Sequence, residues 1–209
     1  MHPPGCSAAV RQSSPPGAGF ERVVAIGASI GGLDALKQIL SALPAGYPWP
    51  VIALLHTSAG YRGTRLDTLL AQYCALPVRE AEPRLPLEAG VVHLAPAGYH
   101  LLVEKDLRFS LSIDEKVSYV RPSANVLFES LAEACGAGAI GVILTGANDD
   151  GAAGLAAIRA GGGLAIVQDP QEAQAPQMPQ AALRVAGADQ VLPLQAIGAR
   201  LAALPRERA

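Results

Sequence analysis

Short, uninterrupted apolar runs alternate along this chain with longer stretches in which apolar residues recur at helical spacing. Runs of four or five apolar residues, bounded by glycine, proline or polar residues, are typical of strands buried on both faces of a sheet. Such runs predict strands at 23–26, 51–55, 91–95, 141–145 and 164–167, with shorter strands at 77–82 and 190–192. Helical spacing predicts helices at 33–40, 66–73, 123–135, 152–160, 180–185 and 194–204.

This alternation is typical of a doubly wound, three-layer α/β fold with a mostly parallel sheet. Residues 100–113 break the pattern, because two short apolar segments flank a Lys105-Asp106 turn and predict a β-hairpin. A hairpin is antiparallel, so we expect a small antiparallel annex to the parallel sheet. Ser123 stands where the N-cap of the following helix is expected.

A glycine-flanked serine follows the first predicted strand, in the order Gly27-Ala28-Ser29-Ile30-Gly31. A serine on a tight strand-to-helix turn holds its hydroxyl at the edge of the sheet, and the glycines let the backbone turn sharply. The turn also leaves backbone N–H groups at the start of a helix, where they can stabilise an oxyanion. The sequence therefore predicts a nucleophile at Ser29.

Two further candidate catalytic groups follow other predicted strands, His56 after 51–55 and the pair Asp149-Asp150 after 141–145. Sites in doubly wound sheets form outside the carboxyl ends of the strands. Ser29, His56 and one of the two aspartates therefore meet the requirement of a catalytic triad. Each also has a structural explanation, because a histidine can end a strand and aspartates cap helices. For His93 and His100, we keep the structural explanation alone.

Glycine-rich turns after a first strand also occur in nucleotide-binding folds. The dinucleotide fingerprint requires a glycine at the position of Ser29 and an acid roughly 20 residues later, whereas residues 47–52 contain no acid. No Gly-Lys-Ser/Thr follows the turn, which excludes a P-loop. The order Ser, His, Asp differs from the Ser, Asp, His order of the α/β-hydrolases. Nucleotide binding and a lipase-like enzyme are both disfavoured.

Composition narrows the classes of partner. The chain has 209 residues, enough for one domain with a full core, and is 50% hydrophobic but only 4% aromatic. A net charge of −2 does not indicate binding to nucleic acid or to a membrane surface. No apolar run approaches the roughly 18 residues of a membrane span. Three cysteines without metal-type spacing favour a reduced, cytoplasmic protein with no metal site. The Pro-, Ser- and Gly-rich residues 1–21 predict a disordered leader before one domain at 22–205.

Several ordered motifs span residues 23–204. They are Ala25-Ile26-Gly27-Ala28-Ser29 with Gly31-Gly32, the strand ending in His56, Leu94-Ala95-Pro96 followed by His100, Arg121-Pro122-Ser123 with Val126-Leu127-Phe128, Gly141-Val142-Ile143-Leu144-Thr145-Gly146, Asp150-Gly151-Ala152-Ala153-Gly154, and Met178-Pro179. In this order and spacing they resemble the catalytic domain of the chemotaxis receptor methylesterases, the CheB family of protein-glutamate methylesterases. The resemblance covers nearly all of the predicted domain.

The resemblance implies which residues carry the chemistry. It places the nucleophile at Ser29, the histidine at His56 and the aspartate at Asp150, which leaves Asp149 as a neighbour. The implied reaction is hydrolysis of glutamate γ-methyl esters on the helical cytoplasmic region of chemoreceptors, often with deamidation of receptor glutamines. It uses no metal or organic cofactor.

The resemblance also suggests the surroundings of the nucleophile. Backbone N–H groups of Ile30 and Ala147 are expected to hold the oxyanion, and Gly31, Thr57 and Met178 are expected at the substrate pocket. The chain departs from the family pattern at two of these positions, because the family usually has threonine in place of Ile30 and methionine in place of Ala147.

Most family members also carry an N-terminal receiver domain, for which the leader at 1–21 is too short. We therefore expect any regulation to come from a separate partner. Two alternative functions stay open on the sequence: an esterase or amidase acting on another substrate, and an inactive scaffold that binds a partner.

Overall fold

A parallel sheet forms the centre of the computed structural model, which describes residues 20–56 and 65–205. Nearly all of the predicted leader, and Thr57, lie outside the described residues. Within them the sheet has seven strands in the order β3-β4-β2-β1-β7-β8-β9, and every neighbouring pair is parallel. The strands are β1 (Val23–Ala28), β2 (Val51–Leu55), β3 (Val78–Glu80), β4 (Val92–Leu94), β7 (Ala139–Ile143), β8 (Leu164–Gln168) and β9 (Gln190–Leu192).

The central strand β1 is buried on both faces and divides the core in two. Its side chains alternate, so that Val24 and Ile26 join one apolar cluster while Val23 and Ala25 join the other. This two-sided burial explains why the strand reads as a continuous apolar run.

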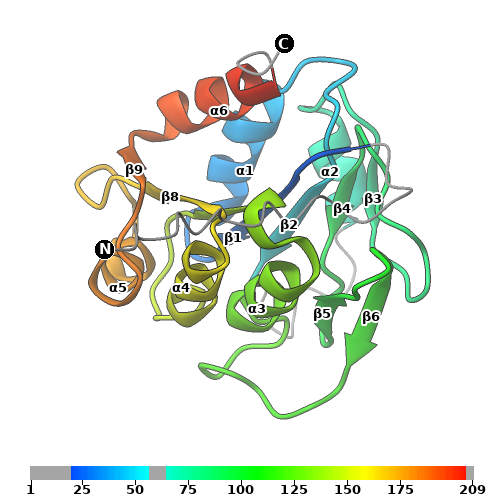
Figure 1. Cartoon of the computed structure of the whole chain (residues 1–209). Coiled ribbons are helices and arrows are strands. Elements are labelled where there is room, and N and C mark those ends of the chain that lie inside the picture. Colours follow the sequence, from blue (N-terminus) through cyan, green and yellow to red (C-terminus); the bar gives the residue numbers. More distant parts are fainter. Residues whose placement is uncertain (1–19, 57–64, 206–209) are drawn as a thin grey trace, which may run out of the picture.

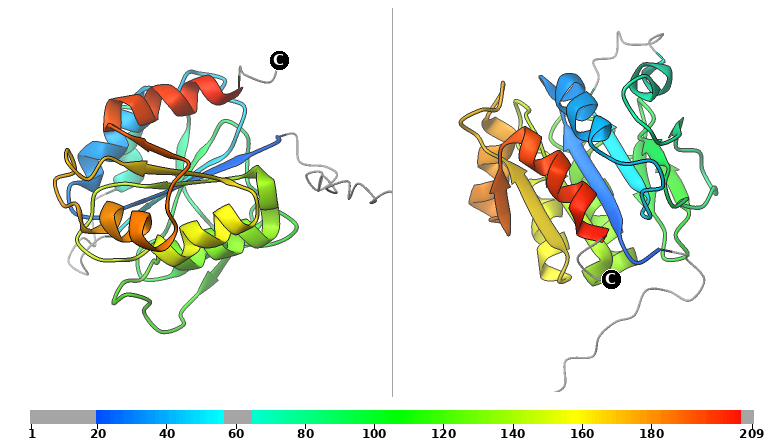
Figure 2. Two further views of the ribbon diagram at one scale, coloured as in Figure 1. Left: turned by 60° about the vertical axis from the view of Figure 1, so that its left-hand side comes forward. Right: turned by 90° about the horizontal axis from the view of Figure 1, so that it is seen from above.

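Helices cover both faces of the sheet, as Figure 1 and Figure 2 show. On one face α1 (Gly32–Ser41) packs beside α6 (Leu194–Ala203). On the other face α3 (Ala124–Cys135) packs on α4 (Ala152–Ala160), which also contacts α5 (Gln177–Val185). The short α2 (Leu66–Ala71) lies near β3 and α1. A single 3₁₀ turn, Gly136–Gly138, follows α3 and was not predicted.

The predicted hairpin forms a separate two-stranded antiparallel sheet of β5 (His100–Val103) and β6 (Phe109–Ser112). It packs on α3, where the Ser130 hydroxyl accepts a hydrogen bond from the Val103 N–H at 3.1 Å. The predicted fold class, a mostly parallel doubly wound sheet with a small antiparallel annex, is therefore confirmed.

Several element boundaries differ by a few residues from the predicted ones, and two of these differences have identifiable reasons. Strand β7 ends at Ile143 instead of continuing to Thr145, whose N–H bonds to the side chain of Gln168. Helix α5 begins at Gln177, three residues earlier than predicted. Pro179 was expected to lie before the helix, but it occupies the first turn instead. A proline is tolerated there, since first-turn N–H groups have no partner within the helix.

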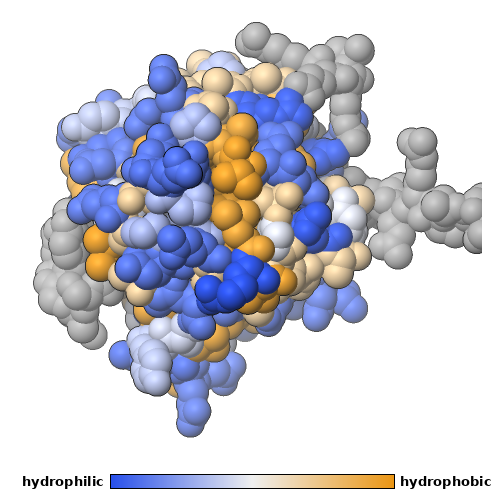
Figure 3. Space-filling model, turned by 90° about the vertical axis from the view of Figure 1, so that its left-hand side faces the viewer, coloured by the Kyte–Doolittle hydropathy of each residue, from blue (hydrophilic) through white to orange (hydrophobic). Residues whose placement is uncertain are grey.

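Both edge strands of the sheet have three residues, which limits the unpaired backbone that they expose. The side that carries α5 and β9 shows an apolar stripe between hydrophilic side chains (Figure 3), and the exposed Val185 and Val191 belong to these two elements. None of the described helices has the length and apolar character needed to cross a membrane.

The close packing of α3 on α4 depends on Gly154. A Cβ added there would lie 2.6 Å from the Cβ of Phe128 and 2.7 Å from the carbonyl oxygen of Asn125. We expect Gly154→Ala to lower the free energy of unfolding by about 1–3 kcal/mol through overpacking. Chemical denaturation measures this change.

Gly161, at the other end of α4, provides the matched control. A Cβ there meets its neighbours at 3.5 Å or more, and its φ of −74° suits any residue. Gly161→Ala should be neutral or stabilising by up to about 1 kcal/mol. Equal destabilisation by the two changes would show that close helix packing does not explain Gly154.

Candidate active site

The strand order reverses direction at β1, which pairs with β2 on one side and with β7 on the other. Ser29 follows β1, His56 follows β2 and Gly146 lies in the loop after β7. Because all three strands are parallel, their carboxyl ends meet at one edge of the sheet. The site therefore forms at the topological switch point, where doubly wound sheets bind ligands.

Backbone hydrogen bonds fix the turn that carries Ser29. The Ser29 N–H donates to the carbonyl of Thr145 at 3.0 Å, and the His56 N–H donates to the carbonyl of Ala28 at 2.9 Å. Gly31 has a φ of +76°, a conformation that favours glycine. A Cβ on Gly31 would also lie 2.5 Å from the side-chain oxygen of Gln174, so no larger residue fits. Ser29 itself is half-buried at the start of α1.

His56 and Asp150 form a buried pair. Nε2 of His56 lies 2.8 Å from Oδ2 of Asp150, and the two side chains are 6% and 0% exposed. Asp150 also accepts hydrogen bonds from the Ser123 hydroxyl at 2.6 Å and from the N–H groups of Ala124 and Asn125. Its carboxylate therefore caps α3 as well as holding the imidazole.

These hydrogen bonds decide the charge of Asp150. Burial alone would raise its pKa, but hydrogen bonds from His56, Ser123 and Ala124 outweigh burial and hold the pKa below the usual range of a carboxyl. An ionised carboxylate can only accept, so Nε2 of His56 carries the proton of their shared hydrogen bond. In a neutral ring Nδ1 is then the acceptor nitrogen, and within the described residues this buried atom has no hydrogen-bond partner.

The structure brings two of the three predicted catalytic residues into contact. His56 bonds to Asp150, as predicted for the triad, whereas Ser29 makes no hydrogen bond to the vacant Nδ1 of His56. Asp149 is exposed and accepts a hydrogen bond from the Ser118 hydroxyl at 2.8 Å. The two adjacent aspartates therefore have different environments, one at the site and one at its rim.

The proposed oxyanion donors come from two loops, because Ile30 directly follows Ser29 and Ala147 lies in the loop after β7. Within the described residues, the N–H groups of Ile30 and Ala147 donate to no other group, whereas those of Ser29 and Gly146 donate to carbonyls. Ile30 is 53% exposed, and Ala147 is exposed too. Two backbone donors are thus available at the edge where Ser29 lies.

Met178 lies under Gly146 rather than at the surface. A Cβ added to Gly146 would lie 1.9 Å from the Met178 sulfur and 2.8 Å from the Ser29 Cβ, so only glycine fits between them. Met178 is fully buried and has no surface open to a substrate. It supports the Gly146 loop from within, together with its N–H, which donates to the Gly146 carbonyl at 2.9 Å.

Thr145 links the turn after β7 to the nucleophile turn, a role that was not predicted from the sequence. Its hydroxyl donates to the Ile30 carbonyl at 2.8 Å and accepts from the Ala175 N–H at 2.9 Å. Its N–H donates to Oε1 of the buried Gln168 at 2.8 Å. No local sequence signal reveals this, because a threonine ending a strand is ordinary until its partners are known.

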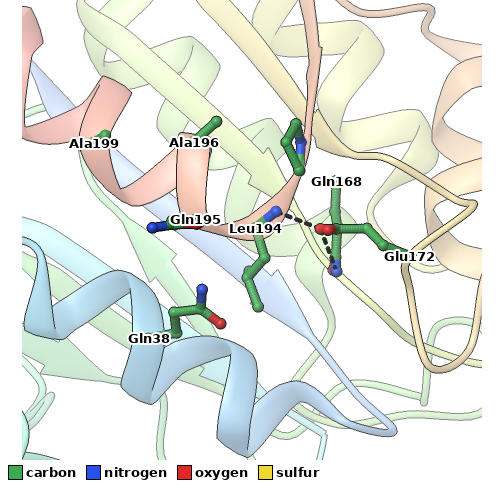
Figure 4. A pocket seen from close by; sticks show the side chains of 8 residues that line it. Gln38, Gln168, Glu172, Leu194, Gln195, Ala196 and Ala199 are labelled. Carbon is green, nitrogen blue, oxygen red and sulfur yellow. Dashed lines mark hydrogen bonds between the residues drawn. The ribbon is translucent and has the colours of Figure 1, made fainter.

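Gln168 continues this network to an open hollow of about 630 Å³ between α1 and α6 (Figure 4). Its Nε2 donates to Oε1 of Glu172 at 3.4 Å, and the same oxygen accepts from the N–H of Leu194 at the start of α6. Gln38 and Gln195 line the hollow from the two helices. The hollow has a mixed lining, with glutamine and glutamate side chains beside apolar residues at the start of α6, and His56 is not among the residues that line it.

The other two described histidines are structural. His93 is buried against Phe109 and accepts a hydrogen bond from the Glu88 N–H, and burial lowers its pKa to about 4. His100 is buried with Nε2 3.0 Å from the carbonyl oxygen of Glu115. Among residues 20–56 and 65–205, no cluster of three His, Cys, Asp or Glu side chains could hold a metal ion.

Comparison with known proteins identifies relatives along nearly the whole described chain. The CheB methylesterase family model matches residues 24–201. A putative protein-glutamate methylesterase/protein-glutamine glutaminase of Leptospira interrogans is 44% identical over 85% of this chain and 91% of its own. The protein-glutamate methylesterase FrzG of Myxococcus xanthus is 40% identical over 92% of this chain and 57% of its own.

A solved structure has the same fold. The CheB methylesterase catalytic domain of Thermotoga maritima superposes with a TM-score of 0.84 and 31% sequence identity, covering 88% of this chain and 99% of that one. The resemblance predicted from the sequence motifs is confirmed by these matches.

The lowered pKa of Asp150 predicts how stability depends on pH. A carboxyl whose folded-state pKa lies below its unfolded value of about 3.9 stabilises the fold above that pH. This stabilisation is lost as pH falls from about 4 through the folded-state pKa. Asp150→Asn should lower the free energy of unfolding at pH 7 by about 1–3 kcal/mol, because it removes a hydrogen-bonded charge. The difference in the free energy of unfolding between this variant and wild type should become smaller below pH 4.

Urea denaturation of both proteins between pH 7 and pH 3 measures this dependence. Asp149→Asn is the control, since its amide oxygen can still accept from Ser118 and the site is exposed. A deficit of Asp150→Asn that stays constant with pH would contradict an ionised Asp150 as its cause.

Proposed function

The chain belongs to the CheB methylesterase family, and from this membership we propose that it is a serine hydrolase that cleaves glutamate γ-methyl esters on chemoreceptors. The observation that carries the proposal is the buried His56–Asp150 pair beside Ser29 at the switch point of the sheet. A charged carboxylate this deeply buried is costly unless it is fully hydrogen-bonded. Its retention next to a histidine with a vacant nitrogen supports a catalytic use.

In the proposed mechanism Nδ1 of His56 is the general base. The Ser29 side chain rotates toward this vacant nitrogen, and its hydroxyl oxygen attacks the ester carbonyl as the proton passes to Nδ1. Asp150 holds the ring through Nε2 and stabilises the imidazolium that forms. The imidazolium then protonates the methoxide oxygen, so that methanol leaves and an acyl-enzyme remains on Ser29.

Water completes the cycle. His56 removes a proton from a water molecule that attacks the acyl-enzyme carbonyl, and the serine oxygen leaves as it regains that proton. The N–H groups of Ile30 and Ala147 stabilise the oxyanion in both steps, since their backbone donors are not used elsewhere in the described chain. The steps use only groups of this chain and water.

Two side chains differ from the family pattern, and the mechanism accommodates both. Ile30 and Ala147 act through their backbone N–H groups, which survive the change of side chain, although any contribution of a threonine hydroxyl at position 30 is lost. The Ile30 carbonyl is in addition fixed by the Thr145 hydroxyl, which orients the adjoining peptide. These points favour an enzyme over an inactive scaffold.

Glutamine deamidation is the second proposed activity. The Leptospira interrogans relative is named both methylesterase and protein-glutamine glutaminase. The same acyl-enzyme forms if ammonia leaves in place of methanol, so one site can serve both reactions. The proposed partner is the helical cytoplasmic region of a chemoreceptor or related signalling protein, which places the reaction in the cytoplasm.

Release of methanol from a methyl-labelled receptor fragment tests the function directly. We expect wild type to release it and Ser29→Ala to lower kcat by several orders of magnitude, as loss of a triad nucleophile does. Ser41→Ala, at the exposed end of α1, is the control and should match wild type. Release by Ser29→Ala at the wild-type rate would reject the mechanism, and no release by wild type would reject the function.

The two adjacent aspartates should differ sharply in the same assay. Asp150→Asn should lower kcat on the order of 10⁴-fold, because an amide cannot stabilise the imidazolium or enforce its tautomer. Asp149→Asn should stay within about threefold of wild type, since Asp149 contacts Ser118 and not the imidazole. A larger loss of kcat in Asp149→Asn than in Asp150→Asn would show that Asp149, and not Asp150, is the catalytic aspartate.

A further inference from the structure

The loop between β6 and α3 ends in a strained tip. Val117 and Val120 form an isolated antiparallel bridge, with the Val120 N–H donating to the Val117 carbonyl at 3.0 Å. Between them Ser118 and Tyr119 have φ values of +49° and +65°. Turns with two consecutive positive φ values favour glycine or asparagine, so serine and tyrosine are strained here.

Packing does not account for the tyrosine at this tip. Tyr119 is 95% exposed and Ile113, at the start of the same loop, is 73% exposed. The loop projects from the body of the molecule below α3 and β6 (Figure 1). A large aromatic side chain held in an unfavourable backbone conformation without burial is a reason to infer a contact outside the chain.

The loop is held firmly despite its exposure. Nη1 of Arg121 donates to the carbonyls of Ile113 and Asp114 at 2.6 and 2.8 Å, which ties the two ends of the loop together. Nε2 of His100 lies 3.0 Å from the Glu115 carbonyl oxygen. These hydrogen bonds hold the two ends of the loop from which the tip projects.

The same loop is joined to the candidate active site at its tip and again at its end, where α3 begins. The Ser118 hydroxyl donates to Asp149, the neighbour of Asp150. A few residues further on, Ser123 and the N–H groups that begin α3 donate to Asp150 itself. Tyr119 thus stands at the rim of the site that holds the His56–Asp150 pair.

We propose that Tyr119, on the loop that also exposes Ile113, is a docking surface for the protein substrate, where the polypeptide flanking the reactive glutamate binds. This inference rests on the proposed function, which supplies a helical protein substrate. Rigid, exposed aromatic residues bind with little loss of conformational entropy and often dominate binding energy. The loop also exposes the charged Asp114, Glu115 and Lys116, so the ring of Tyr119 offers a single apolar contact to a side chain of the substrate helix. Such a contact selects a protein over a free amino-acid ester.

Two substrates with the same scissile bond separate docking from chemistry. One is a methylated receptor cytoplasmic fragment, and the other is a small ester, N-acetyl-glutamate N-methylamide γ-methyl ester. We expect Tyr119→Ala to raise KM for the fragment roughly tenfold with kcat little changed, as loss of a binding hot spot does. The value of kcat/KM for the small ester should change by less than about twofold.

Tyr73→Ala provides a matched control, because Tyr73 is also exposed, at 44%, but follows α2 beside α1. It should leave KM for the fragment unchanged. Tyr119→Gly provides a second variant that relieves the positive φ, so it should raise Tm by about 1–4 °C while raising KM like the alanine variant. A stabilised protein with weakened docking excludes misfolding as the cause.

Three results would overturn the docking surface. One is an unchanged KM for the fragment in Tyr119→Ala, and another is an equal loss on both substrates, which would assign Tyr119 to the catalytic machinery. The third is a wild-type dimer in sedimentation that Tyr119→Ala dissociates, which would assign the surface to a second copy of the chain. Failure of the proposed function is distinguishable, because wild type would then hydrolyse neither substrate.

Discussion

A buried, ionised carboxylate constrains the rest of the site. Asp150 lies where water cannot solvate it, so the protein must supply its hydrogen bonds. They come from His56 and from the start of α3, which are far apart in the sequence. The imidazole, the N-terminus of α3 and the loop after β7 are therefore held in register by one functional group, and its charge also fixes the tautomer of the imidazole.

Thr145 plays the corresponding part for the nucleophile. Its carbonyl accepts from Ser29, its hydroxyl donates to Ile30 and its N–H is held by Gln168. Each such bond contributes about 0.5–1.5 kcal/mol net, yet together they leave the Ser29 turn little freedom. The backbone of the turn is rigid while the Ser29 side chain stays unbonded to His56, so a side-chain rotation completes the proposed catalytic contact.

Most of the fold could be predicted from the sequence, because strands buried on both faces and amphipathic helices leave clear patterns. The candidate residues at strand ends could also be predicted, since parallel strands bring their carboxyl ends together. The double role of Ser123, which caps α3 and donates to Asp150, could not, because it depends on contacts between distant segments. The strained tip at Tyr119 was missed for a different reason: neither serine nor tyrosine is a turn signal with positive φ.

The order of the strands also determines when the candidate active site can assemble during folding. The hydroxyl of Thr145 and the carbonyl of Ile30 are 115 positions apart, and His56 and Asp150 are separated by 94. Contacts this distant close large loops and form late, which slows folding relative to helical proteins of similar size. During synthesis on the ribosome, β1 can pair with a strand at each of its edges only after β7 has been made. A nascent chain that has exposed Ser29 thus lacks both the carboxylate and the backbone partners of the site until most of the polypeptide has emerged.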